Sequence, residues 1–364
     1  MSKKKPYMYY SGATDTTGKA LAKELKATHG RTKPAGTDKI CICWGCKTDK
    51  PMNMGKMAVL NHPDKIRANR HKFNTLKTLA AAGVYVGNHT DAKSIMHLLE
   101  NPGSGSDEPM TLPVIGRKNY HQGGKDFHIC LSKGHVKKAI EAGAMYFRNH
   151  LEIVNEYRLH VFQGVVINAQ RKTERKNLKE AFTSQHAERI KNNAAKKNLK
   201  LDDATVNHVL GDIGGRQGHA NQIIKSNTKG WRFSQMKLTN VKQPLKEAAI
   251  AAVEAVGLDF AAVDCVILED GRPAIIELNT GPGLDGTPFT AYIKAFQEAI
   301  KAINNPKKVA AAPVAAKTQS AKAGPAVQGK TSADKLRLMA DMLDEAASDD
   351  EKAVVNTLFD RMFS

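Results

Sequence analysis

The chain has 364 residues, of which 41% are hydrophobic and 25% charged, and it carries a formal net charge of +19 with a pI of about 9.6. This length allows a sizeable core in two or three lobes. No run of about 18 apolar residues occurs, and the start MSKKKPYMYY lacks the apolar stretch of a secretory signal. We therefore expect a globular cytoplasmic protein with no membrane segment, whose charge favours a nucleotide, an acidic polypeptide or a nucleic acid as partner.

The first 62 residues are predicted to form a small α/β unit. Three short β-like runs, MYYSG, ICICWG and MAVLN, alternate with the helical segment GKALAKELKATHG, which closes on Gly30. Cys43 and Cys46 have the spacing of half a zinc site or of a redox pair. Because their setting is strand-like and no second cysteine or histidine pair follows, we interpret the cysteines of this run as packing residues.

Residues 66–86 repeat apolar side chains at helical spacing up to Gly83, where the helix would stop and a strand begin. A second helix and a loop follow over residues 91–110. Residues 111–132, TLPVIGRKNYHQGGKDFHICLS, are typical of two strands joined by a glycine-bearing turn. Such a turn suits a close approach of backbone to phosphate, although glycine pairs are also common in ordinary hairpins.

A second hairpin is predicted over EYRLHVFQGVVINAQRK, with Gln163-Gly164 as its turn. A two-residue turn would place four polar side chains on one face: Glu156, Arg158, His160 and Arg171. These charges either bind phosphate or carboxylate through charge-assisted hydrogen bonds or form structural ion pairs, and both interpretations stay open. His160 by itself is interpreted as a packed or surface histidine and not as a ligand.

Residues 171–200 are densely basic and poor in aromatic side chains, which does not favour sequence-specific binding of single strands. A solvated helical face is the simpler interpretation. WRFSQMKLTN then predicts a strand, QPLKEAAIAAVEAVG a helix ending at Gly257, and TAYIKAFQEAIKAI an amphipathic helix. Residues 306–331 are rich in Ala, Pro and Lys and predict a flexible linker. Residues 332–364 fit a pair of short amphipathic helices that would dock or mediate oligomerisation.

The most informative segment is AVDCVILEDGRPAIIELNTGPG, which predicts two strands joined by a two-residue Asp270-Gly271 turn. Counting back from that turn pairs Asp264 with Glu277 across the strands. Asn279 lies on the same face because side chains alternate along a strand. Two carboxylates and an amide oxygen in one place suit Mg²⁺, which proteins commonly hold together with substrate phosphates.

The alternative interpretation is a solvated sheet face on which the two acids tolerate each other. The neighbouring residues argue against it. By alternation, Val266 and Ile275 share the face of the acids, and Ala274 and Ile276 lie on the opposite face. A strand that is apolar on both sides does not readily carry like charges opposite each other.

These residues resemble the ATP-grasp superfamily, and within it the RimK-like carboxylate-amine ligases and similar proteins encoded by bacteriophages. The similarity covers residues 66–300. Its most specific element is the Asp264, Glu277, Asn279 set followed by TGPGL, and EYRLHVF and KSNTKGW are also similar to RimK-like segments. The resemblance implies an α/β (α+β) fold in five parts: a pre-ATP-grasp domain (1–62), an N-terminal lobe with a glycine lid (63–145), a C-terminal lobe with the metal set (146–305), the linker (306–331) and the helical tail (332–364).

The resemblance also implies ATP as cofactor, with Mg²⁺ or alternatively Mn²⁺. It assigns the metal to Asp264, Glu277 and Asn279. The residues it assigns to the nucleotide are Lys72, Arg117, Lys118, His121, Gly123, Gly124, Lys125 and Arg171. Those it assigns to substrate and the transferring phosphoryl group are Arg158, Lys225 and Asn227. Two positions depart from the family pattern: Arg117 replaces a lysine, and Asp126 places a carboxylate in the lid, where it would repel the triphosphate unless Lys125 or metal offsets it.

The implied activity is ATP-dependent joining of a carboxylate and an amine through an acylphosphate, with an acidic peptide or protein among the expected substrates. Phosphoryl transfer of this kind depends on placement and charge neutralisation and requires no Ser, Cys or His nucleophile. The alternative is a catalytically weak ATP-grasp scaffold or virion-associated protein that contacts polyanions through its basic insert. A third and less favoured possibility is non-specific binding of nucleic acid.

Overall fold

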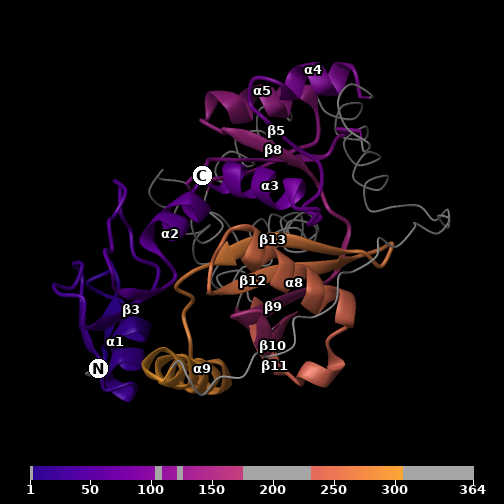
Figure 1. Cartoon of the computed structure of the whole chain (residues 1–364). Helices are drawn as coiled ribbons and strands as arrows, with labels where there is room; N and C mark the ends of the chain where they lie inside the picture. The colour runs from indigo at the N-terminus through magenta and orange to yellow at the C-terminus, as the bar shows by residue number, and fades with distance from the viewer. Residues whose placement is uncertain (1–2, 103–108, 121–125, 175–230, 306–364) are drawn as a thin grey trace, which may run out of the picture. The chain divides into compact units, whose positions relative to one another are not determined.

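The computed structural model describes residues 3–102, 109–120, 126–174 and 231–305 (Figure 1). Contacts divide the chain into two units, residues 1–169 with 235–364 and residues 170–234. The predicted linker and tail, most of the basic stretch, the lid residues 121–125 and the KSNTKGW segment lie outside the described residues. Within the described part, no helix is both long and apolar enough to cross a membrane.

The N-terminal part folds as the predicted α/β unit. Its elements are β1 (Lys5–Tyr9), α1 (Thr16–Glu24), β2 (Thr28–Gly30), β3 (Lys39–Cys43) and β4 (Ala58–Leu60). The strands form a parallel sheet in the order β2-β1-β3-β4. The predicted end of the helix at Gly30 is wrong. Lys26 adopts a left-handed conformation (φ 51°) that ends the helix early, and the segment up to Gly30 pairs with β1 instead.

The three cysteines of CICWGC are packing residues, as predicted. Cys41, Cys43 and Cys46 are fully buried, and none of the five cysteines forms a disulfide. Hydrogen bonds with the sulfurs of Cys41 and Cys46, together with burial, raise the pKa of the Cys43 thiol, so this group is held in its protonated, unreactive form.

Two helices follow, α2 (Pro63–Arg70) and α3 (Lys72–Ala81). The chain breaks between them at His71, which is extended (ψ 90°) and whose Nδ1 accepts from Asn74 N. Gly83 (φ 76°) ends α3 as expected, but the strand predicted directly after it does not form there. The next strand is β5 (His89–Asp91), followed by α4 (Ile95–Glu100).

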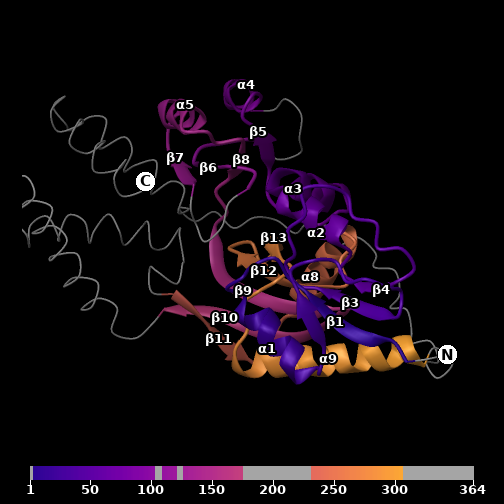
Figure 2. The same cartoon turned by 90° about the vertical axis from the view of Figure 1, so that its left-hand side faces the viewer.

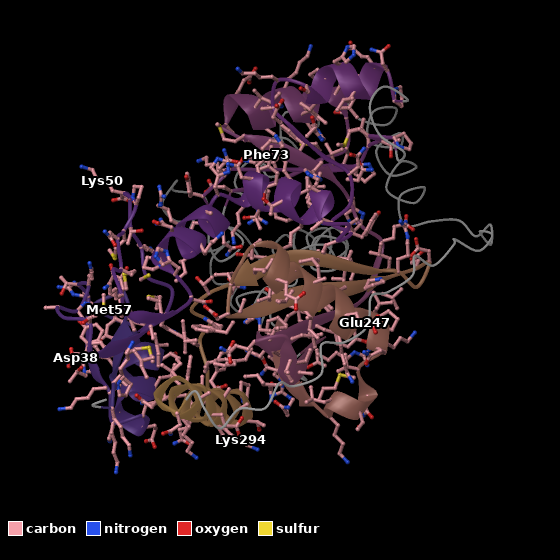
Figure 3. All side chains as sticks on the ribbon, viewed as in Figure 1. Asp38, Lys50, Met57, Phe73, Glu247 and Lys294 are labelled. Carbon is pink, nitrogen blue, oxygen red and sulfur yellow. The ribbon has the colours of Figure 1, made fainter. Side chains whose placement is uncertain are left out.

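The second sheet has the order β5-β8-β6-β7. Its strands β6 (Val114–Arg117) and β7 (Phe127–Cys130) are the antiparallel pair predicted on either side of the lid. The sequence analysis missed α5 (Lys133–Glu141) and β8 (Tyr146–Asn149). Phe73 of α3 stacks on Tyr146 of β8 at a ring distance of 5.8 Å, so α3 packs on the β8 side of this sheet (Figure 3).

The third sheet has the order β11-β10-β9-β12-β13. Its strands are β9 (Ile153–Phe162), β10 (Val165–Glu174), β11 (Trp231–Met236), β12 (Phe260–Leu268) and β13 (Pro273–Asn279). Gln163 and Gly164 form the two-residue turn between β9 and β10, both with positive φ (44° and 77°). The short helix η2 (Leu238–Asn240) leads into α8 (Gln243–Ala255), which packs on β12 and β13. The last helix, α9 (Gly286–Asn304), lies beside α1 (Figure 2).

Asn61 joins the end of β4 to the start of β12. Its side chain is fully buried and makes three hydrogen bonds: Nδ2 donates to Phe260 O (2.8 Å), and Oδ1 accepts from Asp259 N (2.7 Å) and Phe260 N (3.1 Å). Asn61 also has a left-handed backbone (φ 59°), which asparagine tolerates better than most residues. The side chain therefore fixes where the strand carrying Asp264 begins.

Replacing Asn61 by Ala should lower the free energy of unfolding by about 2–3 kcal/mol, because it leaves buried backbone groups unpaired. Asn61→Gly should lose the same hydrogen bonds but recover about 1 kcal/mol, since glycine carries no penalty for positive φ. Urea denaturation of the unchanged chain, Asn61→Ala and Asn61→Gly measures the loss of the hydrogen bonds and the penalty for positive φ. Equal stability of Asn61→Ala and the unchanged chain would contradict the assigned role.

Candidate active site

The turn of the acidic hairpin is one residue longer than predicted. Leu268 N donates to Arg272 O (3.0 Å), and Gly271 N donates to Leu268 O (3.0 Å), so three residues connect the strands. Gly271 has the positive φ (84°) that this loop needs and that glycine adopts without strain. The predicted two-residue turn is therefore wrong.

The predicted pairing of Asp264 with Glu277 is nevertheless confirmed. Next to the turn, Cys265 faces Ile275, which is shifted by one residue from the predicted register. A β-bulge at Ile276 takes up the extra residue, and beyond it the predicted register returns. The longer loop and the bulge thus compensate each other.

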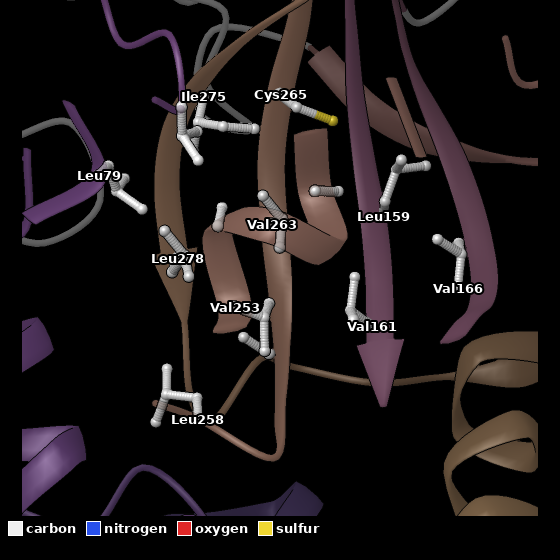
Figure 4. Packing of buried hydrophobic residues seen from close by; sticks show 14 of the residues in the cluster. Leu79, Leu159, Val161, Val166, Val253, Leu258, Val263, Cys265, Ile275 and Leu278 are labelled. Atoms are coloured by element: carbon white, nitrogen blue, oxygen red, sulfur yellow. The ribbon is translucent and has the colours of Figure 1, made fainter. Parts of the chain in front are cut away.

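The bulge also changes which face some side chains occupy. The prediction that Ile275 lies on the face of the acids is wrong, since it packs in the same core cluster as Val263 and Cys265 (Figure 4). Ala274 and Ile276, predicted on the opposite face, pack instead in the cluster that contains Val266. Both faces are apolar, which confirms that the two acids lie in a buried sheet.

Asp264 is held by a cation from the neighbouring strand. Arg158 of β9 lies directly opposite it and forms a bidentate pair, with Nε 2.6 Å from Oδ1 and Nη2 2.8 Å from Oδ2. Asn279 Nδ2 lies 3.5 Å from Asp264 Oδ2, so the third predicted metal ligand also reaches this carboxylate. Of the two interpretations left open for Arg158, the structure shows the ion pair. His160, two residues on, is buried and packs edge-on against Tyr292, which is the packed one of the two states, packed or surface, that we predicted.

Glu277 is held by the lysine predicted to grip phosphate. Lys72 Nζ lies 2.8 Å from Glu277 Oε1, and both side chains are largely buried. Burial acts to raise the pKa of Glu277, but the positive charges of Lys72, Arg117 and Arg158 outweigh it, so the pKa is lowered. The carboxyl is therefore ionised at neutral pH and surrounded by cations.

The lowered pKa predicts a defined pH dependence of stability. A carboxyl whose pKa is lower in the folded than in the unfolded state stabilises the fold above its unfolded value, about 4.3, and loses this contribution as the pH falls through its folded value. The stability difference between the unchanged chain and Glu277→Gln should thus shrink as the pH is lowered below about 5. Denaturation curves between pH 3 and 7 measure it, and a difference independent of pH would contradict the assignment.

β13 is an edge strand whose outward backbone groups are satisfied from elsewhere. Leu278 O accepts from Asn69 Nδ2 (3.1 Å) and from Lys72 Nζ (3.4 Å). Ile275 N donates to Tyr85 O (2.9 Å). The junction of α2 and α3 is therefore bonded directly to the strand that carries Glu277 and Asn279.

The end of β6 adds further positive charge. Burial lowers the pKa of Arg117, while Tyr146, Glu277 and Asp126 act to raise it, and its guanidinium lies 5.0 Å from the centre of the Phe127 ring. Lys118 Nζ lies 3.0 Å from Asp126 Oδ1. The charge of Asp126, which as a lid residue would repel phosphate, is thus balanced by Lys118.

The structure brings together the core of the predicted site. Around the carboxylates of Asp264 and Glu277 lie three positively charged side chains, those of Arg158, Lys72 and Arg117, and the amide of Asn279. Other predicted residues are not placed. His121, Gly123, Gly124, Lys125, Lys225 and Asn227 lie outside the described residues. Arg171 belongs to the second unit, and its part in the site stays a prediction. Sequence reasoning missed Asn69, for which no local pattern gave a signal.

The donor set fits a hard cation. Asp264, Glu277 and Asn279 supply oxygen atoms from neighbouring positions of one buried hairpin, which is the chemistry that Mg²⁺ prefers. Among the described residues no group of three or more His, Cys, Asp or Glu side chains could hold a metal, so this set has two carboxylates and relies on the asparagine for a third ligand. Each carboxylate is paired with a positively charged side chain, Asp264 with Arg158 and Glu277 with Lys72.

The three sheets and the placement of this hairpin define an ATP-grasp fold. A D-alanine–D-alanine ligase from Bacillus anthracis superposes with a TM-score of 0.53 and 12% identity, over 83% of this chain and 99% of that one. A RimK domain ATP-grasp protein from Sphaerobacter thermophilus gives 0.50 and 11%, over 80% and 98%. No family model and no curated protein sequence matches the chain. The predicted ATP-grasp fold is confirmed, whereas the predicted helical tail lies outside the described residues.

Proposed function

We propose that the protein is an ATP-dependent carboxylate-amine ligase. The observation that carries this proposal is the cross-strand pairing of Asp264 with Glu277 in an ATP-grasp fold, with each carboxylate paired with a positively charged side chain. A solved structure of the same fold is a D-alanine–D-alanine ligase, and another is a RimK domain protein. Mg²⁺, when bound, would neutralise charge on the phosphates of ATP and align them.

The residues of the chain supply placement and charge. Asp264, Glu277 and Asn279 would hold the metal, and Lys72 and Arg117 would bind phosphate oxygens. Lys72 now neutralises Glu277, so its ammonium is already beside the metal ligands. Arg158 pairs with Asp264 and would stabilise charge on the transferring phosphoryl group.

The proposed reaction proceeds in two balanced steps. An oxygen of the substrate carboxylate attacks the γ-phosphorus of ATP, the bond to the bridging oxygen breaks, and ADP leaves from an acylphosphate. The amine then attacks the acyl carbon, inorganic phosphate leaves, and the amine loses a proton. A lid over residues 121–126, including the proposed lid residues His121, Gly123, Gly124 and Lys125, would exclude water from the acylphosphate. Lys225, Asn227 and Arg171 are proposed to contact substrate and phosphate.

The substrates are proposed to be an amine and a carboxylate, with acidic peptides as the first candidates because the chain is strongly basic. The test is ADP release from ATP and Mg²⁺ against a panel of amino acids and acidic peptides. We expect release only when a carboxylate and an amine are both present, with an amide as the product. Failure of a non-hydrolysable ATP analogue to bind in calorimetry with Mg²⁺ would overturn the proposal.

A further inference from the structure

Asn69 of α2 lies next to the candidate site without belonging to the predicted set. Its side chain is only 3% exposed. Its Nδ2 donates to the Leu278 carbonyl, which lies in the chain between the two proposed metal ligands Glu277 and Asn279. Lys72 donates to the same carbonyl oxygen, so two donors from the α2–α3 junction meet on one backbone group of β13.

One further contact joins the backbone of Asn69 to α3, and two neighbouring contacts fix the start of that helix. Its carbonyl oxygen accepts from Thr75 Oγ1 (3.1 Å), and Thr75 Oγ1 also lies 3.2 Å from His71 O. Lys72 N in turn donates to Asn119 O (3.0 Å) at the end of the β6 segment. The backbone of Asn69 is therefore bonded to the first part of α3, the helix that begins with Lys72.

Stability alone does not explain an asparagine at this position. Its Oδ1 is buried and has no hydrogen-bond partner among the described residues. A buried amide that makes one bond and leaves an acceptor unpaired loses about as much as it gains, so an apolar side chain of similar size would serve the fold equally well. What such a side chain could not do is hold the Leu278 carbonyl.

We infer that Asn69 is a positioning residue that sets β13 against Lys72, so that Glu277 and Asn279 meet a metal-bound nucleotide in the correct geometry. This inference rests on the proposed function. Residues that orient metal ligands from outside the coordination sphere typically contribute about 10–100-fold to metal affinity. The contribution of Asn69 should appear where metal and nucleotide are bound together.

The test is calorimetric titration of the full chain with a non-hydrolysable ATP analogue, with excess Mg²⁺ and again with EDTA. Asn69→Leu should weaken binding in Mg²⁺ by about tenfold or more and change binding in EDTA by less than about threefold, since Lys72 is retained. Asn69→Ser, which is too short to reach Leu278 O, should behave in the same way and serves if the leucine variant does not fold.

Asn168→Leu is the matched control. Asn168 of β10 is equally buried (3% exposed), donates through Nδ2 to Gln235 Oε1 (3.3 Å), and also has an Oδ1 without a partner among the described residues. Its strand is not adjacent to β13, so its replacement should leave both titrations unchanged.

The outcomes separate the two claims. If the unchanged chain binds no nucleotide in Mg²⁺, the proposed function fails. If the unchanged chain binds the nucleotide, three results would show that the positioning role of Asn69 is wrong while the proposed function stands. The first is that Asn69→Leu and Asn69→Ser bind the nucleotide as tightly as the unchanged chain. The others are that they lose affinity equally in Mg²⁺ and in EDTA, or that they lose no more affinity than Asn168→Leu does.

Discussion

Asp264→Asn is expected to reduce Mg²⁺-dependent ADP formation by roughly 10²–10³-fold, the usual effect of removing one group that stabilises charge in a transition state. The substitution keeps the size of the side chain and an oxygen for Arg158, but it removes the negative charge with which Asp264 would neutralise the metal. Steady-state ADP release measures the loss, and circular dichroism checks that the fold is retained.

Asp270→Asn is the control for this prediction. Asp270 lies on the same hairpin, at the exposed turn, where it pairs with Arg272. Its replacement should leave ADP formation within about twofold of the unchanged rate, as for surface changes distant from a site. Full activity of Asp264→Asn would show that the carboxylate holds no catalytic metal and would favour the alternative of a binding scaffold.

Arg158→Met should have the largest effect on stability, lowering the free energy of unfolding by about 3–5 kcal/mol, because it leaves the carboxylate of Asp264 buried without its cation. The side chains of Arg158 and Asp264 are 21% and 13% exposed. Urea denaturation measures the change. Removing the charge as well, in Arg158→Met with Asp264→Leu, should restore most of the stability without restoring activity.

The acidic hairpin contains a second Arg–Asp pair with the same shortest N–O distance in a different environment. Arg272 Nε lies 2.6 Å from Asp270 Oδ2, as Arg158 Nε does from Asp264 Oδ1, but these side chains are 49% and 47% exposed. Solvent screens such a pair, so Arg272→Met should cost about 1 kcal/mol or less. Equal losses in the two variants would mean that burial does not determine the strength of the Arg158 pair.

The acidic hairpin illustrates what could be predicted from the sequence. Alternating β-rich runs around Asp-Gly identified both strands, and the pairing of Asp264 with Glu277 is correct. The turn length and the bulge were both missed, because neither leaves a residue signal distinct from an ordinary strand. The longer turn and the bulge cancel in the register of Asp264 and Glu277. They do not cancel at Ile275, which lies between them, so the face of this residue was predicted wrongly.

Other differences have identifiable signals. The missed helix α5 begins at Ser132, whose Oγ accepts from His135 N, and is followed by Gly143 with φ 90°. A serine N-cap and a glycine stop could have predicted it. The early end of α1 had no such signal, since Lys26 adopts a conformation more usual for glycine.

Contacts between distant segments could not be read from local patterns at all. Lys72 was assigned to phosphate by resemblance, but its pair with Glu277 depends on how α3 packs beside β13. Asn69 gave no signal, because a single asparagine on a helix is usually a surface residue. The residues that each strand contributes to the candidate site could thus be predicted from the sequence. The hydrogen bonds and ion pairs between distant segments depend on the tertiary fold and could not.

The covered edge of β13 has a consequence for solubility. An open edge strand with apolar side chains on both faces is a template for pairing with another chain. Here Asn69, Lys72 and Tyr85 occupy its outward backbone groups. These contacts should therefore hinder intermolecular β-pairing, so the residues that bond to β13 would also protect the protein from self-association.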